Sequence, residues 1–360
     1  MLIMNNNISL NNKNWKEFTF EIIFEINATV SGIDGNKLTR KNGDIPYVTR
    51  SNKNNGMDMF VGQQHTKYRH NRGNTITIGL DTQTVFYQSS KFYTGQNIQV
   101  LRNKALNRHI ALFLIPLVKR QMEKFNWGGN GATITRLKRS KIFLPVSSNG
   151  DPDYKFMEGY IHQKEQDKLK AYQTYITQRL SSIEVSNSLI PLAQKKCREF
   201  YIKEVSEILS GKDIYETKRK IGHTPYISAT AKNNGIGNFI SNKNSTQEAG
   251  CLSVNRNGSV GYSFYHPYNA LFSNDCRKLR LKQPSRLAGI FISQQITQQK
   301  EKYGYGYKMG TARLEKQKIM LPTTSENTPD YAYMIEYMRV LEHKKLAAYC
   351  KYKGFETNAS

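Results

Sequence analysis

The chain has 360 residues and a formal net charge of +25, from 53 lysine and arginine residues against 28 aspartate and glutamate residues. This length suits two domains, and the hydrophobic content of 38% is enough for two modest cores. The basic excess is spread along the chain, which indicates folded surfaces that meet a polyanion. Nucleic acid is the first candidate, and a generically basic protein is the alternative.

Cysteine usage and hydropathy exclude several classes of protein. The four cysteines are widely scattered and form no Cys-x-x-Cys pair. The sequence therefore predicts neither a zinc site nor a disulfide framework, and a reducing cytoplasm is expected. No apolar run reaches the roughly 18 residues of a membrane-spanning helix, so no membrane association is expected.

One stretch of the sequence occurs twice, at residues 46–56 and 225–235. In both copies Pro, Tyr, Lys, Asn, Asn and Gly stand at the same positions, and an aliphatic residue and a hydroxyl residue follow the Tyr. The tyrosine and β-branched residues favour a strand. The Lys-Asn-Asn-Gly end favours a turn, because Asn and Gly tolerate positive φ.

The flanks of this stretch match as well. Lys16 answers Arg198, an offset of 182 residues, and Pro152 answers Pro329, an offset of 177. A period of about 178 residues is far longer than the period of solenoids or propellers. We interpret it as two homologous domains in one chain. The alternative is chance matching in an Asn- and Lys-rich sequence.

The first segments of the chain give a leader and the start of a core. Residues 1–12 are expected to form a flexible leader. Residues 14–26 mix strand and helix signals, and a polar loop follows at 37–44. The core candidates of this region are Phe18, Phe20, Ile22, Ile23, Phe24 and Ile26.

Each copy then predicts a β-hairpin. In the first, residues 75–78 alternate polar and apolar side chains, and residues 84–87 are the expected partner strand. In the second, residues 252–254 are followed by the turn Asn255–Gly258 and a strand at 260–264. Asn-Gly between two apolar runs is a strong hairpin signal.

The rest of each copy follows one order. A buried helix, a glycine-rich aromatic loop, a basic segment and a final strand are expected in turn. The helices are predicted at 106–124 and 287–302, the loops at 125–131 and 303–308, and the strands at 142–146 and 319–321.

A long helix is expected to close each copy, from Asp153 to about Leu180 and from Asp330 to about Lys353. Each aspartate follows a proline and is expected to cap the helix or lie in its first turn. Apolar residues at spacings of three and four predict packing against another helix. On these helices the predicted partner-binding residues are Met157, Tyr160, Ile161, Tyr172, Tyr175, Met334, Tyr337, Met338, Leu341, Tyr349 and Tyr352. On this hypothesis, aspartate at Met334, Met338 and Leu341 abolishes partner binding and leaves the domains folded.

No catalytic signature is present in the sequence. It has no dinucleotide-binding glycine motif after a strand, no phosphate-binding P-loop and no Asn-Pro-Pro-aromatic tetrapeptide. Asp153 and Lys155 resemble part of a nuclease metal site, but the second copy has Ala332 in place of the lysine, so capping is favoured. His65 and His70 have no metal-ligand counterparts in the second copy. The chain is therefore interpreted as a binder without a metal site of its own.

What recurs in both copies is basic residues interleaved with aromatic, amide and hydroxyl residues. Lysine and arginine neutralise phosphates, while Arg and Asn read base edges in the major groove. Arg50 stands where the second copy has Ala229, so it is a candidate for different base preferences. The predicted DNA-binding residues are Thr49, Arg50, Ser51, Lys53, Asn54, Asn55, Arg69, Arg72, Trp127, Arg136, Lys138, Thr230, Lys232, Asn233, Asn234, Arg256, Tyr305, Tyr307, Lys308 and Arg313.

Three alternatives stay open for these residues. Each could be a solvated surface side chain. The Lys-Asn-Asn-Gly turn could recur for its backbone geometry alone. The aromatic loops could fill the core beside the closing helices.

The duplicated Pro-Tyr strand, the glycine-bearing loop before a Lys-Ile-x-Leu-Pro strand, and the helix closing each half resemble a known family. It is the specificity (S) subunit of type I restriction–modification systems and of their type IIB relatives. The resemblance covers residues 14–354. After Leu-Pro this chain lacks the second Pro and the Glu-Gln usual in type I subunits, and its closing helices look shorter. Both differences favour the compact type IIB-like form.

The resemblance implies an α+β fold with two target-recognition domains of mixed sheet and helices, separated by two antiparallel spacer helices in a pseudo-twofold arrangement. The implied segments are a leader at 1–12, domain 1 at 13–151, spacer helix 1 with connector at 152–196, domain 2 at 197–328, spacer helix 2 at 329–354 and a tail at 355–360.

The resemblance also implies a function. Each domain would read one half of a bipartite double-stranded DNA site, and the helices would dock a separate adenine-N6 methyltransferase subunit, possibly fused to a nuclease. S-adenosylmethionine and magnesium would belong to that partner, and this chain would hold no cofactor. The alternatives are a stand-alone DNA-binding regulator and a nuclease with an unrecognised site.

Overall fold

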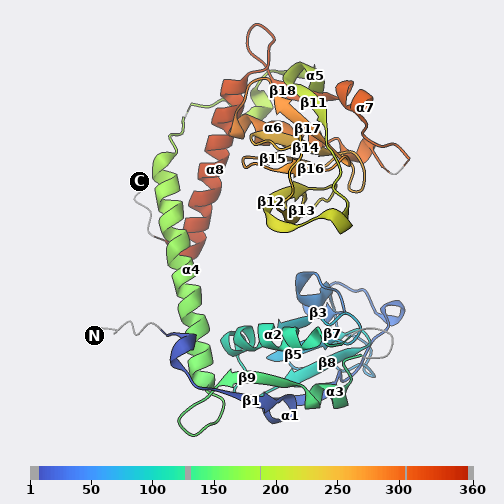
Figure 1. Cartoon of the computed structure of the whole chain (residues 1–360), viewed down its shortest axis with the longest axis vertical. Coiled ribbons are helices and arrows are strands. Elements are labelled where there is room, and N and C mark those ends of the chain that lie inside the picture. The colour runs from blue at the N-terminus through green and yellow to red at the C-terminus, as the bar shows by residue number, and fades with distance from the viewer. Residues whose placement is uncertain (1–7, 126–130, 187, 305, 356–360) are drawn as a thin grey trace. The chain divides into compact units, whose positions relative to one another are not determined.

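The computed structural model describes residues 8–125, 131–186, 188–304 and 306–355 (Figure 1). The chain divides into two compact units, Met1–Tyr172 and Gln173–Ser360, and each unit has its own core. In the described part of the chain, no helix is both long and apolar enough to cross a membrane.

The first unit contains three small sheets. The four-stranded antiparallel sheet has the order β2 (Glu25–Ala28), β8 (Ile98–Arg102), β5 (Thr75–Gly79) and β6 (Val85–Gln88). The three-stranded sheet has the order β4 (Met57–Val61), β3 (Ile45–Val48) and β7 (Tyr93–Thr94), with β3 and β7 parallel. β1 (Trp15–Thr19) pairs with β9 (Lys141–Pro145). The helices are α1 (Phe20–Ile23), α2 (Arg108–Met122) and α3 (Ile134–Arg139).

The second unit repeats this topology strand for strand. Its four-stranded sheet has the order β11 (Ser206–Ser210), β17 (Cys276–Leu281), β14 (Cys251–Asn255) and β15 (Ser263–His266). Its other sheets are β13 (Ile236–Ile240), β12 (Ile221–Ile227) and β16 (Leu271–Phe272), and β10 (Cys197–Tyr201) with β18 (Lys318–Pro322). The helices are α5 (Ile202–Val205), α6 (Arg286–Thr297) and α7 (Thr311–Glu315). The matching strand order confirms two homologous α+β domains.

Short 3-10 helices complete the described secondary structure. They are η1 (Leu10–Asn12), η2 (Gly35–Lys37), η3 (Asn54–Gly56), η4 (Leu192–Gln194), η5 (Glu216–Lys218), η6 (Asn233–Gly235) and η7 (Lys300–Lys302).

Both predicted hairpins are present, because alternation and turn chemistry are local signals. β5 pairs with β6 from Thr75 with Gln88 to Ile78 with Val85. In the second copy β15 begins at Ser263, later than expected. Gly258 and Gly261, with φ of 58° and 81°, extend the connecting loop there.

The closing helices are α4 (Tyr154–Ser182) and α8 (Tyr331–Lys353). The expected caps are confirmed. Asp153 accepts a hydrogen bond from the Phe156 N–H at 2.9 Å, and Asp330 accepts one from the Tyr333 N–H at 2.9 Å. Each carboxylate therefore satisfies a backbone N–H in the first turn of its helix.

Within the second unit, the last turns of α4 pack against α8 in antiparallel order (Figure 1). Ile176 and Leu180 share a buried cluster with Cys350. Arg179 forms a bidentate ion pair with Glu342, with both N–O distances 2.8 Å. Two parallel N–H···O bonds of this kind fix the direction of a side-chain pair as well as its strength.

The face of α8 that meets α4 is not the predicted stripe. Leu346 and Ala347 pack against the α4 cluster, whereas Ala348 and Tyr352 are exposed. The spacing of three and four residues predicts one stripe, broken by Lys345, through Met334, Met338, Leu341, Ala348 and Tyr352. The helix instead buries one face on its own domain near its N-terminus and another on α4 near its C-terminus.

One further expectation at the N-terminus is wrong. Ile22 is 67% exposed and not in the core, because α1 is a single turn whose inner face takes Phe20 and Ile23. In the described part of the predicted leader, the Ile8 N–H donates to Gln163 of α4 at 2.9 Å, and Leu10 packs on the core. Residues 1–7 of the predicted leader lie outside the described residues.

Candidate nucleic-acid interface

The Lys-Asn-Asn-Gly turn of the first copy (the first amide turn, Lys53–Gly56) connects β3 to β4. Asn54, Asn55 and Gly56 have φ of 49°, 56° and 77°. The Gly56 N–H donates to the Lys53 carbonyl at 2.8 Å, and the Gly56 carbonyl accepts the Thr49 N–H at 2.7 Å. Successive positive φ values explain why the sequence has Asn-Asn-Gly here.

The second amide turn (Lys232–Gly235) has the same geometry. Asn233, Asn234 and Gly235 have φ of 50°, 52° and 76°. The Gly235 N–H donates to the Lys232 carbonyl at 2.9 Å. In both copies the lysine and the two asparagine side chains are exposed. A fixed backbone therefore presents one cation and two amides to solvent, which suits contact with phosphates and base edges.

The tyrosine of each Pro-Tyr pair anchors the strand before the turn. Tyr47 and Tyr226 are buried, and burial raises the pKa of both phenols. The Tyr47 hydroxyl donates to the Ile33 carbonyl at 2.8 Å, and the Tyr226 hydroxyl accepts the Ile214 N–H at 3.0 Å. These tyrosines support the turn from within.

The hydroxyl residues predicted to bind DNA are used within the turns. Thr49 Oγ1 donates to the Gly56 carbonyl at 3.3 Å, and Ser51 Oγ accepts the Lys53 N–H at 3.1 Å. In the second copy Thr230 Oγ1 accepts the Lys232 N–H at 3.2 Å. These hydroxyls hold the backbone that presents the lysines.

The tip of the β5–β6 hairpin lies beside the first amide turn. Arg50 forms an ion pair with Asp81, and Thr82 Oγ1 donates to the Arg50 carbonyl at 2.8 Å. The Asn97 side chain donates to Asp81 at 3.4 Å. The Arg50 side chain keeps 43% exposure. Arg50 is therefore held in one direction and still open to a base edge or a phosphate.

The second copy has the same neighbours with different chemistry. Ala229 replaces the arginine, and its carbonyl accepts the Ser259 N–H at 3.0 Å. Asn257 donates to Asp275 at 3.2 Å, and Arg256 lies 3.8 Å from Asp275. The two domains thus present similar backbones with different charges.

The structure does not bring Arg72 to this surface. Arg72 precedes β5, whereas Asp81 and Thr82, which contact Arg50, follow the other end of that strand. The N–H of Arg69 donates to Ser31 at 3.1 Å. Arg72 lines a separate pocket.

The aromatic loops are only partly described, since Trp127 and Tyr305 lie outside the described residues. Tyr307 stacks on Tyr303 at 5.7 Å, and the Arg313 guanidinium lies 3.9 Å from the Tyr307 ring centre. Arg313 also donates to the Lys308 carbonyl at 2.6 Å, as Arg136 donates to the Gly131 carbonyl at 3.0 Å. In both copies this arginine holds the loop. Lys138 is exposed on α3.

The predicted partner-binding residues separate into three groups. Met157 and Met334 are fully buried in the cores of their own units, so they are not available to a partner and these two predictions are wrong. Methionine is common both in cores and at docking faces, and spacing alone does not distinguish them. Tyr160, Ile161, Tyr337, Met338, Leu341 and Tyr349 are half-buried, and Tyr172, Tyr175 and Tyr352 are exposed.

Sequence reasoning missed Asp81 and Asn97. A signal was present, because the pair Asp81 and Asn97 becomes Asn257 and Asp275 in the second copy, with acid and amide exchanged. When two positions exchange acid and amide together between the repeats, the two side chains are expected to contact each other.

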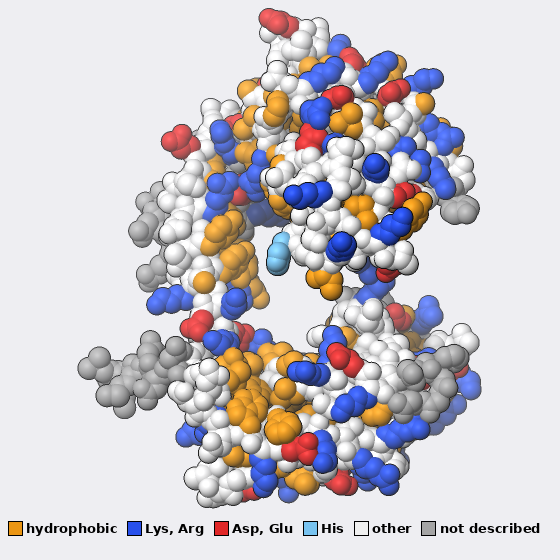
Figure 2. Space-filling view, viewed as in Figure 1, with side chains coloured by type: hydrophobic (Ala, Val, Ile, Leu, Met, Phe, Trp, Pro, Cys, Tyr) orange, Lys and Arg blue, Asp and Glu red, His pale blue; other side chains and the backbone are white. Residues whose placement is uncertain are grey.

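Lysine and arginine side chains are distributed over the visible face of both domains, and acidic side chains are fewer (Figure 2). Among the described residues, no group of three or more His, Cys, Asp or Glu side chains could hold a metal ion.

Comparison with known proteins agrees with this architecture. The family model described as the type I restriction modification DNA specificity domain matches twice, at residues 12–171 and 194–348. The chain belongs to this family. Its members are non-catalytic DNA-recognition components, so the chain is the specificity subunit of a restriction–modification system.

Two relatives illustrate the match. The chain is 35% identical over 315 residues to a curated Heyndrickxia coagulans protein named type II restriction enzyme BgcI specificity subunit S.BcgI, covering 87% of this chain and 90% of that one. A crystal structure of the type I restriction–modification S subunit from M. genitalium has the same fold, with a TM-score of 0.52, 17% identity, and coverage of 96% of this chain and 94% of that chain.

Proposed function

We propose that this specificity subunit reads a bipartite double-stranded DNA site, one half with each domain. The observation that carries the proposal is the pair of amide turns, which have one backbone geometry and different neighbours. Exposed Lys53 and Lys232 suit phosphates, which position a protein on DNA. The difference between Arg50 and Ala229 suits different base preferences in the two halves.

The proposal includes a partner. A separate adenine-N6 methyltransferase subunit, alone or fused to a nuclease, docks on the closing helices, where Tyr172 is exposed in the first unit and Tyr175 and Tyr352 are exposed in the second. S-adenosylmethionine and magnesium belong to that partner. A DNA target of this kind places the complex in the bacterial cytoplasm.

The test is co-expression with an adenine methyltransferase of a restriction–modification system, followed by sequencing for N6-methyladenine. We expect a split motif of two short halves with a fixed gap. With Arg50→Ala, the half of the motif that the first domain reads should become less selective, and the other half should stay unchanged. The expected loss of discrimination against wrong bases is about 1–3 kcal/mol, the contribution of one bidentate base contact. Methylation without this chain, or without a defined motif, would sink the proposal.

The lysines of the turns give a second prediction. Lys53→Gln and Lys232→Gln should each weaken binding of the full chain to cognate DNA and lower the slope of log affinity against log salt by about 1, because each removes one phosphate contact. Lys119→Gln, at an exposed position on α2, is the matched control. Equal slopes for all three variants would contradict the assignment of the turns.

A further inference from the structure

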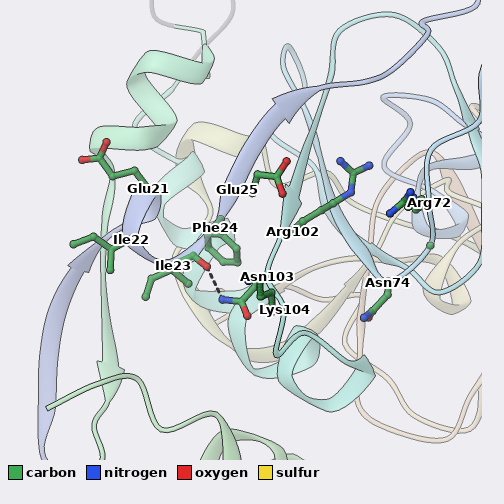
Figure 3. A pocket seen from close by; sticks show the side chains of 11 residues that line it. Glu21, Ile22, Ile23, Phe24, Glu25, Arg72, Asn74, Arg102, Asn103 and Lys104 are labelled. Atoms are coloured by element: carbon green, nitrogen blue, oxygen red, sulfur yellow. Dashed lines mark hydrogen bonds between the residues drawn. The ribbon is translucent and has the colours of Figure 1, made fainter. Parts of the chain in front are cut away.

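A cavity of about 710 Å³ opens in the first unit beside α1, β2 and the end of β8 (Figure 3). Arg72, Arg102 and Lys104 supply positive charge to its lining, and Glu21 and Glu25 supply negative charge. Figure 3 shows Arg72 and Arg102 on one side of the pocket and Glu21 on the other.

One nitrogen of the Arg102 guanidinium has no hydrogen-bond partner within the described residues. This atom, Nε, is buried. Glu25 lies directly opposite on β2, but its carboxylate accepts a hydrogen bond from Asn27 at 2.7 Å. A buried guanidinium nitrogen without a partner is unusual, because buried polar groups in folded proteins are hydrogen-bonded.

The second unit shows what this arginine position accepts. Arg280 occupies the equivalent place on β17, opposite Glu207 as Arg102 is opposite Glu25. Arg280 donates to both carboxylate oxygens of Glu248, at 2.7 and 3.0 Å, and to Glu207 at 2.6 Å. Arg280 and Lys278 together hold the pKa of Glu248 below its usual value.

The first unit lacks this internal carboxylate. Glu248 stands three residues before β14, and the residue three before β5 is Arg72. An arginine therefore replaces the glutamate. Val100 correspondingly replaces Lys278, since Thr77 pairs with Val100 where Ser253 pairs with Lys278. The first unit has exchanged a closed ion-pair network for an open pocket with two arginines.

We propose that Arg102 and Arg72 bind a carboxylate supplied by an acidic side chain of a partner protein subunit. A guanidinium fork matches a carboxylate with two parallel hydrogen bonds, as Arg280 shows with Glu248. Glu21 and Glu25 in the same lining disfavour a continuous polyanion such as DNA. Ile22, 67% exposed on the lining, suits the apolar part of a protein segment. The assignment of the carboxylate to a partner subunit rests on the proposed function, whereas the carboxylate-binding site itself does not.

The site is tested by titrating the full chain with an end-blocked peptide of about six glutamates at low salt. Arg72→Glu places a carboxylate beside Arg102, as Glu248 lies beside Arg280, and should weaken peptide binding at least tenfold. Lys53→Glu makes the same change in net charge at the amide turn, and should leave peptide binding within twofold. Equal losses in the two variants would mean that only net charge attracts the peptide, and would overturn the site.

Two further variants protect the test against misfolding. Arg102→Gln should lose peptide binding like Arg72→Glu. Conversely, the double variant Glu248→Arg with Lys278→Val copies the first unit into the second, and should add a second peptide site. If Arg102→Gln still binds the peptide and the double variant gains no second site, the proposal is overturned.

The source of the carboxylate is tested separately. Arg72→Glu should reduce capture of the co-expressed methyltransferase, whereas the methylated motif of the complex that still forms should be unchanged. Undiminished capture overturns a partner subunit as the source. If duplex DNA competes with the peptide in the unmodified chain, and this competition is lost in Arg72→Glu, the pocket binds a DNA phosphate instead. A missing motif in the unmodified complex, by contrast, would count against the proposed function alone.

Discussion

Met334→Asp is expected to unfold the second domain. Met334 is fully buried in the same cluster as Phe291 and Leu321. The substitution removes its contacts and places a carboxylate in an apolar core, at a loss of at least about 4 kcal/mol of unfolding free energy. Chemical denaturation followed by circular dichroism measures this loss.

The matched control is Tyr352→Asp on the same helix, where the side chain is 79% exposed. It should change stability by less than about 0.5 kcal/mol. If Met334→Asp instead stays folded and only loses its partner, the original docking hypothesis for Met334 is restored.

Acid should destabilise the second domain through His266. This imidazole is buried between Tyr268 and Phe272, with Nε2 2.8 Å from Ser253 Oγ. Burial lowers the pKa of His266 from 6.5 to about 4. Between these values the unfolded chain binds a proton that the folded chain does not, so stability falls as pH decreases from 6.5 towards 4 and is unaffected above that interval.

The first domain supplies the control substitution. Gln88 occupies the position equivalent to His266, and its side-chain amide donates to Thr77 at 3.2 Å. His266→Gln should keep such a bond to Ser253 without titrating. We expect it to remove about 2 kcal/mol of the stability loss between pH 7.5 and 5, measured by urea denaturation at each pH. Identical pH profiles for the two proteins would show that another group is responsible.

The sequence predicted features that depend on neighbours along the chain. The amide turns, the hairpins and the caps at Asp153 and Asp330 follow from residues a few positions apart. The repeat added the domain count, and the family resemblance added the fold.

The missed or wrong features depend on contacts distant in sequence. A helical stripe shows that a face is covered but not what covers it. Spacing alone therefore predicts a partner at Met334 and Met157, whereas their own domains cover both side chains. The pocket at Arg102 depends on strand register and on which side chain precedes the neighbouring strand. Residue type alone placed Arg72 with the DNA-binding residues.

The hydrogen bond between Asp81 and Asn97 in the first unit corresponds to the one between Asn257 and Asp275 in the second, with acid and amide exchanged. This exchange limits how the two halves of the gene can recombine. A crossover between the codons for residues 81 and 97 and their counterparts yields two reciprocal hybrids. One places Asp81 against Asp275, two carboxylates where an amide–acid bond stood, and the other places Asn257 against Asn97, which can still bond. Crossovers that create new specificities should therefore have most of their breakpoints outside this interval. Within the interval, the hybrid with Asn257 and Asn97 should be recovered more often than the hybrid with Asp81 and Asp275.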